Sequence, residues 1–378
     1  MSRFGLVKYG LCSCLAALLG MAGPLSAQSS GGEVSRERQA ELQKASELSL
    51  RPTSTMPSPY RLVENWPTLP PGMEWGAAIG IVPDDTGGTW MLFRSEIPIL
   101  YINSDGQVTK SFGEGMIVQA HGFCMDRDGN LWAGDSGPFG DDPSSRGRGF
   151  QIHKFSQDGE LLMSLGRAGV SRADEANTFI GPTACTVAPN GNIIIADGHW
   201  PRPSTAQQDG DRLVVVTPEG AFVRETGRLG AGPGEFMGPH SLALDADGRI
   251  FVADRSNNRI QILDRDLNFV DDWRHFGRPS GVTVLSDGTL VVSDSESGAT
   301  IPGPDTALDG LSGVRNPGFQ VGIRVGRVDG SLRYFIPGTR PEGMAADNLG
   351  NIFAGLTGGC DVSPSGGCLQ KWVPVRPR

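Results

Sequence analysis

The sequence has few of the residues that most often carry chemistry. Its 378 residues include five histidines, four tyrosines and six cysteines. Lys and Arg number 33 against 42 Asp and Glu, which gives a net charge of −9, and no clustered basic run offsets it. Sequence-independent nucleic-acid binding needs many cations, so this composition argues against it. With so few histidines, the position of each one is informative.

Glycine and proline are abundant, with 54 and 27 residues. They follow no Gly-X-Y period, which excludes collagen, and enough apolar residues remain to exclude general disorder. The length would suit two or three domains, but β-propellers and barrels of this length form one unit.

The first 27 residues have the pattern of a signal peptide. Arg3 and Lys8 precede an apolar stretch at 11–25, and residues 25–27 are suitable for cleavage. This stretch is too short for a comfortable membrane span, and an uncleaved anchor is the alternative. We expect a periplasmic or secreted protein with no membrane span after cleavage. Residues 28–72 then form a linker, partly helical or extended, because prolines interrupt its second half.

Four cysteines follow the signal peptide, and export would allow them to pair. Cys360 and Cys368 flank a short Gly/Ser/Pro loop and are the best candidates for a disulfide. Cys124 and Cys185 lie in apolar strand patterns, where we expect buried free thiols rather than a bridge. No Cys-x-x-Cys or zinc-ribbon spacing is present.

One pattern recurs along the rest of the chain. An apolar strand leads into an Asp-Gly or Asn-Gly turn, whose glycine supplies the positive φ of a tight hairpin, and a second strand ends near Ala-Asp. The copies occupy residues 77–93 (degenerate), 122–135, 184–197, 241–254, 281–294 and 343–355. Six units of roughly 50 residues, with four strands each, predict an all-β fold, a six-bladed β-propeller over residues 73–378.

Alignment of the copies places one residue of each at the start of an innermost strand, beside the central channel. This position holds His121, Thr183, His240, Ser280 and Glu342, with Ala77 or Ala78 nearest in the first blade. Alternate blades lie about 120° apart, so His121, His240 and Glu342 should converge on the axis. Two histidines and a carboxylate suit zinc or another divalent metal with an open position. The alternative is that each histidine only satisfies backbone groups.

A second set of residues follows the closing Asp of each hairpin: Arg94, Ser136, Gly198, Arg255 and Ser295. Arg94 and Arg255 beside a metal would suit a carboxylate substrate or an oxyanion, or would pair with the closing aspartates. His199, one residue further in blade three, is a candidate acid or base, or a surface histidine. His153 and His275 fit no such position, and we expect them to be structural.

Two segments carry a family resemblance. Residues 234–244 and 252–263 resemble NHL-repeat propellers. The chain more closely resembles the peptidyl-α-hydroxyglycine α-amidating lyase family over about residues 73–356, specifically around His121, His240 and Arg255. That family is a six-bladed propeller whose channel zinc is held by three histidines, and it cleaves an N–C bond to release an amide and glyoxylate.

The resemblance implies roles for individual residues. His121 and His240 match two zinc ligands of the family, and Arg94 and Arg255 match its active-site arginines. His199 stands where the family has a catalytic tyrosine. Glu342 replaces the third zinc histidine, and Gly343 stands where the family has an acidic calcium ligand, so a structural Ca²⁺ is not carried over.

Three hypotheses follow. The first is a metal-dependent lyase that resembles the amidating lyases and acts on an α-hydroxylated small-molecule or peptide-derived substrate that carries a carboxylate. The second is a metal-dependent hydrolase, such as a lactonase, on the same scaffold. The third is a non-catalytic NHL-type binding module.

Overall fold

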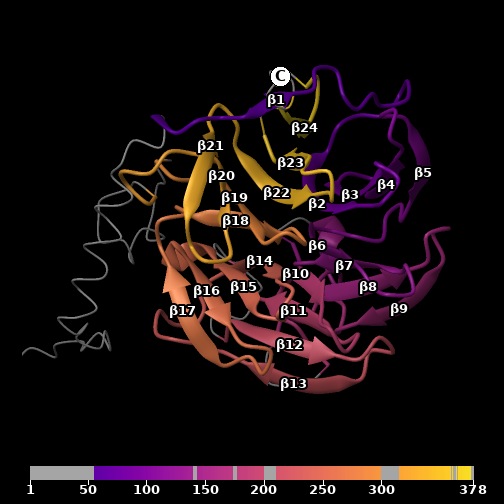
Figure 1. Ribbon diagram of the computed structural model, residues 1–378. Coiled ribbons are helices and arrows are strands. Elements are labelled where there is room, and N and C mark those ends of the chain that lie inside the picture. The colour runs from indigo at the N-terminus through magenta and orange to yellow at the C-terminus, as the bar shows by residue number, and fades with distance from the viewer. Residues whose placement is uncertain are drawn as a thin grey trace, which may run out of the picture. The chain divides into compact units, whose positions relative to one another are not determined.

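The strands of this protein form six antiparallel sheets of four strands each in the part of the chain that the structure describes. The structure is a computed structural model, and it describes residues 55–138, 143–172, 177–199, 210–298, 315–358, 360, 363 and 365–375. The sheets are arranged around one axis as a six-bladed β-propeller, as the repeat predicts (Figure 1). The predicted signal peptide, residues 1–27, lies outside the described residues.

Each blade runs from the channel outward in chain order, except the last. Blade 1 consists of β2 (Ala77–Pro83), β3 (Thr89–Arg94), β4 (Ile99–Ile102) and β5 (Val108–Phe112). Blade 2 consists of β6 (Ala120–Met125), β7 (Leu131–Asp135), β8 (Gln151–Phe155) and β9 (Leu161–Leu165). Blade 3 consists of β10 (Pro182–Val187), β11 (Ile193–Asp197), β12 (Arg212–Val216) and β13 (Phe222–Thr226).

The remaining three blades follow the same plan. Blade 4 consists of β14 (Pro239–Leu244), β15 (Ile250–Asp254), β16 (Arg259–Leu263) and β17 (Phe269–Trp273). Blade 5 consists of β18 (Pro279–Val284), β19 (Thr289–Asp294), β20 (Gly322–Arg327) and β21 (Leu332–Ile336). Blade 6 consists of β22 (Pro341–Ala346), β23 (Ile352–Leu356), β24 (Leu369–Pro374) and β1 (Tyr60–Leu62). Within the described residues, no helix is long and apolar enough to cross a membrane.

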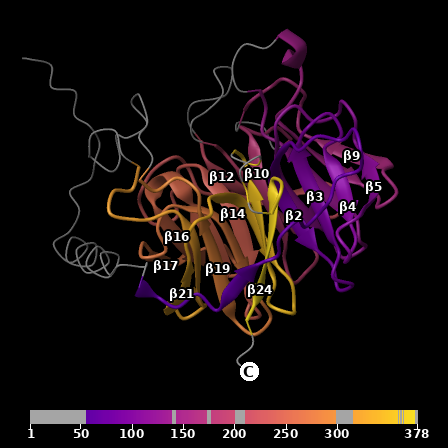
Figure 2. The same ribbon diagram turned by 90° about the horizontal axis from the view of Figure 1, so that it is seen from above.

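The ring closes through a strand from the predicted linker. β1 pairs antiparallel with β24, with Arg61 opposite Val373, and supplies the outermost strand of blade 6. Figure 2 shows this indigo segment against the yellow β24. The propeller therefore begins at Tyr60 rather than at residue 73. Pairing the first strand with the last covers the outer edge of β24 and gives blade 6 the four strands of the other blades, which explains why this segment belongs to the ring.

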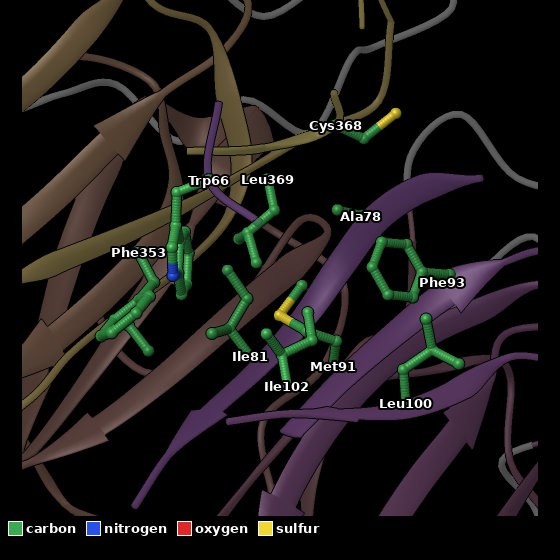
Figure 3. Packing of buried hydrophobic residues seen from close by; sticks show 11 residues of the cluster. Trp66, Ala78, Ile81, Met91, Phe93, Leu100, Ile102, Phe353, Cys368 and Leu369 are labelled. Carbon is green, nitrogen blue, oxygen red and sulfur yellow. The ribbon is translucent and has the colours of Figure 1, made fainter. Parts of the chain in front are cut away.

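The core consists of apolar layers between neighbouring blades. In the described residues there are six such clusters, one at each interface between blades. Figure 3 shows the layer between blades 6 and 1, where Phe353 and Leu369 meet Ile81 and Met91. Each blade thus buries the faces of its sheet against the neighbouring blades, since one hairpin alone cannot cover them.

The turns of the repeat are held by the aspartate that starts them. Asp126 Oδ1 accepts from the backbone N–H of Asp128 at 3.1 Å and of Asn130 at 2.8 Å, and Gly129 has φ +82°. Asp84, Asp245 and Asp347 hold the turns of blades 1, 4 and 6 in the same way, which helps to fix the hairpin register in these blades.

The structure contains two disulfides. Cys360 and Cys368 are joined, which confirms the prediction from their spacing. Cys124 and Cys185 are also joined, so the expectation of free thiols was wrong. The two residues lie on β6 and β10, the innermost strands of neighbouring blades, with Cα atoms 5.6 Å apart. Tapering of the blades toward the axis brings these strands together, which an analysis of each strand alone does not reveal.

Candidate metal centre

The second residue of each innermost strand faces the same end of the channel. Equivalent pairing partners confirm the alignment, because Ala120, Pro239 and Pro341 lie opposite the last residue of the adjacent strand in their blades. His121, His240 and Glu342 follow these positions on β6, β14 and β22. In blade 1, Ala77 pairs with Arg94, so Ala78 takes the equivalent position.

Both histidines are held by the backbone of the next blade. His121 Nδ1 lies 2.7 Å from the carbonyl oxygen of Thr183, and His240 Nδ1 lies 2.6 Å from that of Ser280. A carbonyl only accepts, so each Nδ1 carries a proton and each Nε2 is left with its lone pair. Both Nε2 atoms are buried and have no hydrogen-bond partner among the described residues. Orientation of this kind by a carbonyl is typical of metal-binding histidines.

Glu342 brings a carboxylate to these two nitrogens. Its Oε1 lies 3.3 Å from His240 Nε2 and 3.9 Å from His121 Nε2. His199 joins the group, and the four ligand atoms all lie within 4.8 Å of one another. Unpartnered buried imidazole nitrogens next to a carboxylate match the donors that zinc prefers, so the residues fit a divalent cation. The structure therefore supports a His/Glu metal-binding cluster, whose metal identity it leaves unassigned.

The environment favours the protonation states that ligands need. Burial, aided by the neighbouring histidines, holds the pKa of His121 well below its ordinary value. Burial and the charge of Arg255 lower the pKa of His240. Burial alone would raise the pKa of Glu342, but its contact with His240 and the charges of Arg94 and Arg255 hold that pKa well below the usual range. The histidines are therefore neutral and the carboxylate is charged at neutral pH.

Two arginines reach the same carboxylate. Arg255 Nη1 lies 3.6 Å from Glu342 Oε1, and Arg94 Nη2 lies 3.9 Å from it. Arg94 Nε also donates to the carbonyl of Ala120 at 3.1 Å. The pairing of Arg94 with Ala77 places Arg94 in the closing Asp position itself, one residue earlier than the sequence alignment expected. It reaches the cluster nevertheless, because its side chain is longer than that of aspartate.

The closing aspartates have other cationic partners. Three of them pair with an arginine on the third strand of their blade: Asp197 with Arg212 at 3.0 Å, Asp254 with Arg259 at 2.7 Å and Asp294 with Arg324 at 3.4 Å. These aspartates also accept backbone N–H groups that precede the innermost strands, as Asp197 does from Ile180 at 2.7 Å. This arrangement fixes where each innermost strand begins and leaves Arg255 directed toward the cluster.

His199 lies above the two channel histidines. Its ring centroid is 4.9 Å from that of His121 and 5.4 Å from that of His240, and its Nε2 is 3.4 Å from Arg255 Nη2. Gly198 enables this placement, because it has φ +139° and an added Cβ would lie 2.0 Å from Asp211 Oδ1. The sequence placed His199 beside the site, and the structure brings it into the cluster.

The two histidines outside the cluster have local partners. His153 Nδ1 lies 2.8 Å from Ser164 Oγ, and His275 Nε2 lies 2.7 Å from the carbonyl of Gly330. Both lie on outer parts of their blades, on β8 and just after β17.

Sequence reasoning missed Glu296. Its Oε2 lies 4.0 Å from Arg255 Nε and 2.9 Å from Arg278 Nε, and its Oε1 contacts Arg315. These cations outweigh burial and lower its pKa to about 2. A signal was present, because Glu296 follows Asp294 by two residues, as His199 follows Asp197. The repeat offset that found His199 would also have found Glu296.

Beyond the cluster, the channel narrows to a small cavity. This cavity, of about 130 Å³, is lined by the innermost strands of all six blades, with Gly80, Gly122 and Gly281 among its residues. The metal-binding cluster therefore forms one end of a narrow axial channel.

The comparisons with known proteins agree with this geometry. The NHL repeat family matches residues 236–263 and 276–299. Peptidyl-glycine alpha-amidating monooxygenase B of Xenopus laevis is 29% identical over 275 residues, 69% of this chain and 28% of that protein. A probable peptidyl-alpha-hydroxyglycine alpha-amidating lyase of Caenorhabditis elegans is 30% identical over 192 residues, 50% of this chain and 48% of that one. The chain thus spans less than half the length of these relatives.

A solved structure supports the architecture alone. A gluconolactonase from Xanthomonas campestris superposes with a TM-score of 0.55 at 16% identity, covering 83% of this chain and 89% of that one. The chain is thus a β-propeller with NHL repeats at residues 236–263 and 276–299, and its resemblance to the peptidyl-α-hydroxyglycine α-amidating lyase family is confirmed.

Proposed function

We propose that this protein is a metal-dependent lyase that cleaves the C–N bond of an N-acyl-α-hydroxyglycine, releasing an amide and glyoxylate. The observation that carries the proposal is the convergence of His121, His240 and Glu342 from alternate blades, with both imidazole Nε2 atoms buried and unpartnered. The relatives that match the chain by sequence include an enzyme named for this reaction.

His121, His240 and Glu342 would hold the metal, which when bound would supply a Lewis acid for an oxygen of the substrate. Their convergence leaves one side of the cluster facing His199 and the two arginines. A substrate that enters from this side meets cationic and basic groups.

Arg255 and Arg94 would bind the carboxylate of the substrate. Guanidinium groups pair well with carboxylates, and both arginines lie within 4 Å of Glu342 Oε1, at the edge of the cluster. Glu296 and Arg278 flank Arg255 and hold it against the side of blade 5. Substrate orientation would then direct the α-hydroxyl toward His199.

His199 would move one proton. As the C–N bond breaks, the α-hydroxyl loses its proton and its oxygen forms the aldehyde of glyoxylate. The amide nitrogen takes the bonding electron pair and one proton. A neutral imidazole at His199 can accept the proton from oxygen and deliver it to nitrogen, so atoms and charge balance.

The test is product analysis with N-acetyl-α-hydroxyglycine in ¹⁸O-labelled water, using protein purified without chelators. We expect acetamide and glyoxylate, with no label in the acetamide. Labelled acetic acid would instead show a hydrolase, the second candidate. No turnover and no stoichiometric metal by elemental analysis would favour a non-catalytic NHL-type module.

We also propose that the protein is exported to the periplasm or secreted. Two disulfides are formed in the structure, as an oxidising compartment permits, and residues 1–27 have the pattern of a signal peptide. Edman sequencing of the mature protein would reveal whether cleavage follows Ala27, and an intact N-terminus would contradict the cleavage.

A further inference from the structure

A second cavity adjoins the cluster at Arg94. It has a volume of about 470 Å³ and is lined by Leu69, Trp75, Phe93, Arg94, Ile97 and Leu100, among others. We name it the Trp75 pocket. The sequence did not single it out, because its walls come from the segment before β2, from β3 and β4, and from the turn between them.

One residue, Arg94, links the pocket to the proposed site. Arg94 lines the pocket, and its Nη2 lies 3.9 Å from Glu342 Oε1 in the cluster. Gly76 also borders the pocket, and a Cβ there would lie 2.3 Å from the carbonyl oxygen of Arg94. Arg94 therefore borders the pocket and reaches the cluster, so a substrate carboxylate held by it would lie beside the pocket.

The walls of the pocket are mostly apolar. Phe93 and Leu100 are buried, and the Trp75 ring centroid lies 5.7 Å from that of Phe93. Figure 3 shows Phe93 and Leu100 within the layer that also contains Cys368. Apart from Arg94, the charged residues are Glu74 and Glu96, both exposed. The volume and this lining suit the apolar part of a small ligand.

A disulfide-closed loop supports the aromatic wall. A Cβ on Gly367 would lie 2.1 Å from the Trp75 ring, so the indole packs directly against the backbone there. Gly367 lies in the loop closed by Cys360 and Cys368, and both cysteines pack in the same layer as Trp75. This backing gives the pocket a defined shape.

Two further cavities among the described residues do not offer this path. The axial cavity holds only about 130 Å³ and is lined by the innermost strands, which leaves too little room for a long acyl group. A third cavity, of about 560 Å³, lies between blades 3 and 4 beside Asn190 and Asp247, and no residue of the cluster lines it. Of these three cavities in the described part of the chain, the Trp75 pocket therefore combines room for an acyl group with a residue, Arg94, that reaches the cluster.

We infer that the Trp75 pocket binds the apolar acyl group, or the apolar side chain, that precedes the α-hydroxyglycine of the substrate. This inference rests on the proposed lyase function. It assigns the substrate class as α-hydroxyglycines that carry an aromatic or long aliphatic N-acyl group, in preference to small or charged ones.

The test compares kcat/KM for N-acetyl-, N-hexanoyl- and N-(3-phenylpropanoyl)-α-hydroxyglycine with the metal-loaded protein. We expect the phenylpropanoyl compound to exceed the acetyl compound about tenfold or more. The ratio should fall toward one in Trp75→Ala, which opens the pocket, and in Ile97→Trp, which fills it. Trp273→Ala, which removes a half-buried indole on β17, is the matched control and should keep the ratio. Circular dichroism verifies that each variant folds.

A binding measurement separates failure of the pocket from failure of the function. Saturation-transfer NMR should show 3-phenylpropanamide, but not acetamide, bound to the wild type and to Trp273→Ala, with the signal lost in Ile97→Trp. Turnover of all three substrates at equal kcat/KM would contradict the proposed role of the pocket but not the proposed lyase function. If no substrate is turned over, the proposed lyase function is contradicted. The NMR binding measurement then tests by itself whether the pocket binds apolar groups.

Discussion

At the scale of single residues, the histidines of the cluster differ in the partners of their Nε2 atoms. His121 is held by the Thr183 carbonyl with its Nε2 unpartnered, whereas His199 Nε2 already has Arg255 Nη2 at 3.4 Å. Under the proposed function, His121 would therefore act as a metal ligand, and His199 would interact with Arg255 and the substrate.

This difference predicts two distinct phenotypes. His121→Ala should lose both stoichiometric metal and turnover, because one of three donors is removed. His199→Ala should retain metal and lose about 10²- to 10⁴-fold in kcat, the usual contribution of a positioned acid or base. Elemental analysis together with kcat measures both effects. Loss of metal in His199→Ala would identify His199 as a fourth ligand instead.

Glu296 predicts a change in acid stability. Its pKa is lowered from 4.5 to about 2, so its contribution is present above pH 4.5 and is lost as the pH falls toward 2. The shift corresponds to about 3 kcal/mol in the free energy of unfolding. Glu296→Gln should be less stable at pH 7 and show a flatter dependence between pH 5 and 2, measured by urea denaturation.

The control for this measurement is Glu219→Gln, which changes an exposed turn residue. It should follow the wild-type profile. A Glu296→Gln profile parallel to that of the wild type would contradict the role assigned to the buried carboxylate.

At the scale of strands, the two disulfides differ in what they join. Cys124–Cys185 links innermost strands 61 residues apart in sequence, whereas Cys360–Cys368 closes a separation of eight. The longer loop loses more entropy in the unfolded chain when it is closed.

Removal of the two bridges should therefore have unequal effects. Cys124→Ala with Cys185→Ala should cost about 2–4 kcal/mol of stability. Cys360→Ala with Cys368→Ala should cost less and serves as the comparison. Thermal unfolding of the two double variants gives the ranking, and a larger loss for the short loop would contradict it.

The strands also show what the sequence could reveal. His121, His240 and Glu342 were found from a repeat offset alone, because the residues before them occupy equivalent positions in the strand pairing of their blades. The Cys124–Cys185 pair was missed because the two cysteines do not share a repeat position. Cys124 lies three residues after His121 and Cys185 two residues after Thr183, and they meet only across neighbouring blades. β1 was missed because three residues carry no periodic signal.

At the scale of the whole molecule, ring closure depends on β1. Deletion of residues through Leu62 would leave the outer edge of β24 unpaired, since Tyr60–Leu62 is its partner there. We expect a lower melting temperature and concentration-dependent association, measured by calorimetry and size-exclusion chromatography. Deletion through residue 54 keeps β1 and is the control. Equal melting temperatures for the two deletions would show that β1 is dispensable.

The spacing of the donors along the chain has a consequence for biogenesis. The three come from positions 121, 240 and 342, and each lies on a different blade. A chain that has emerged only as far as blade 4 carries His121, His199 and His240 but lacks Glu342, and blade 6 is complete only when β24 pairs with β1. If the protein binds metal as proposed, the full donor set would form only in a completed ring, so metal content would report on maturation.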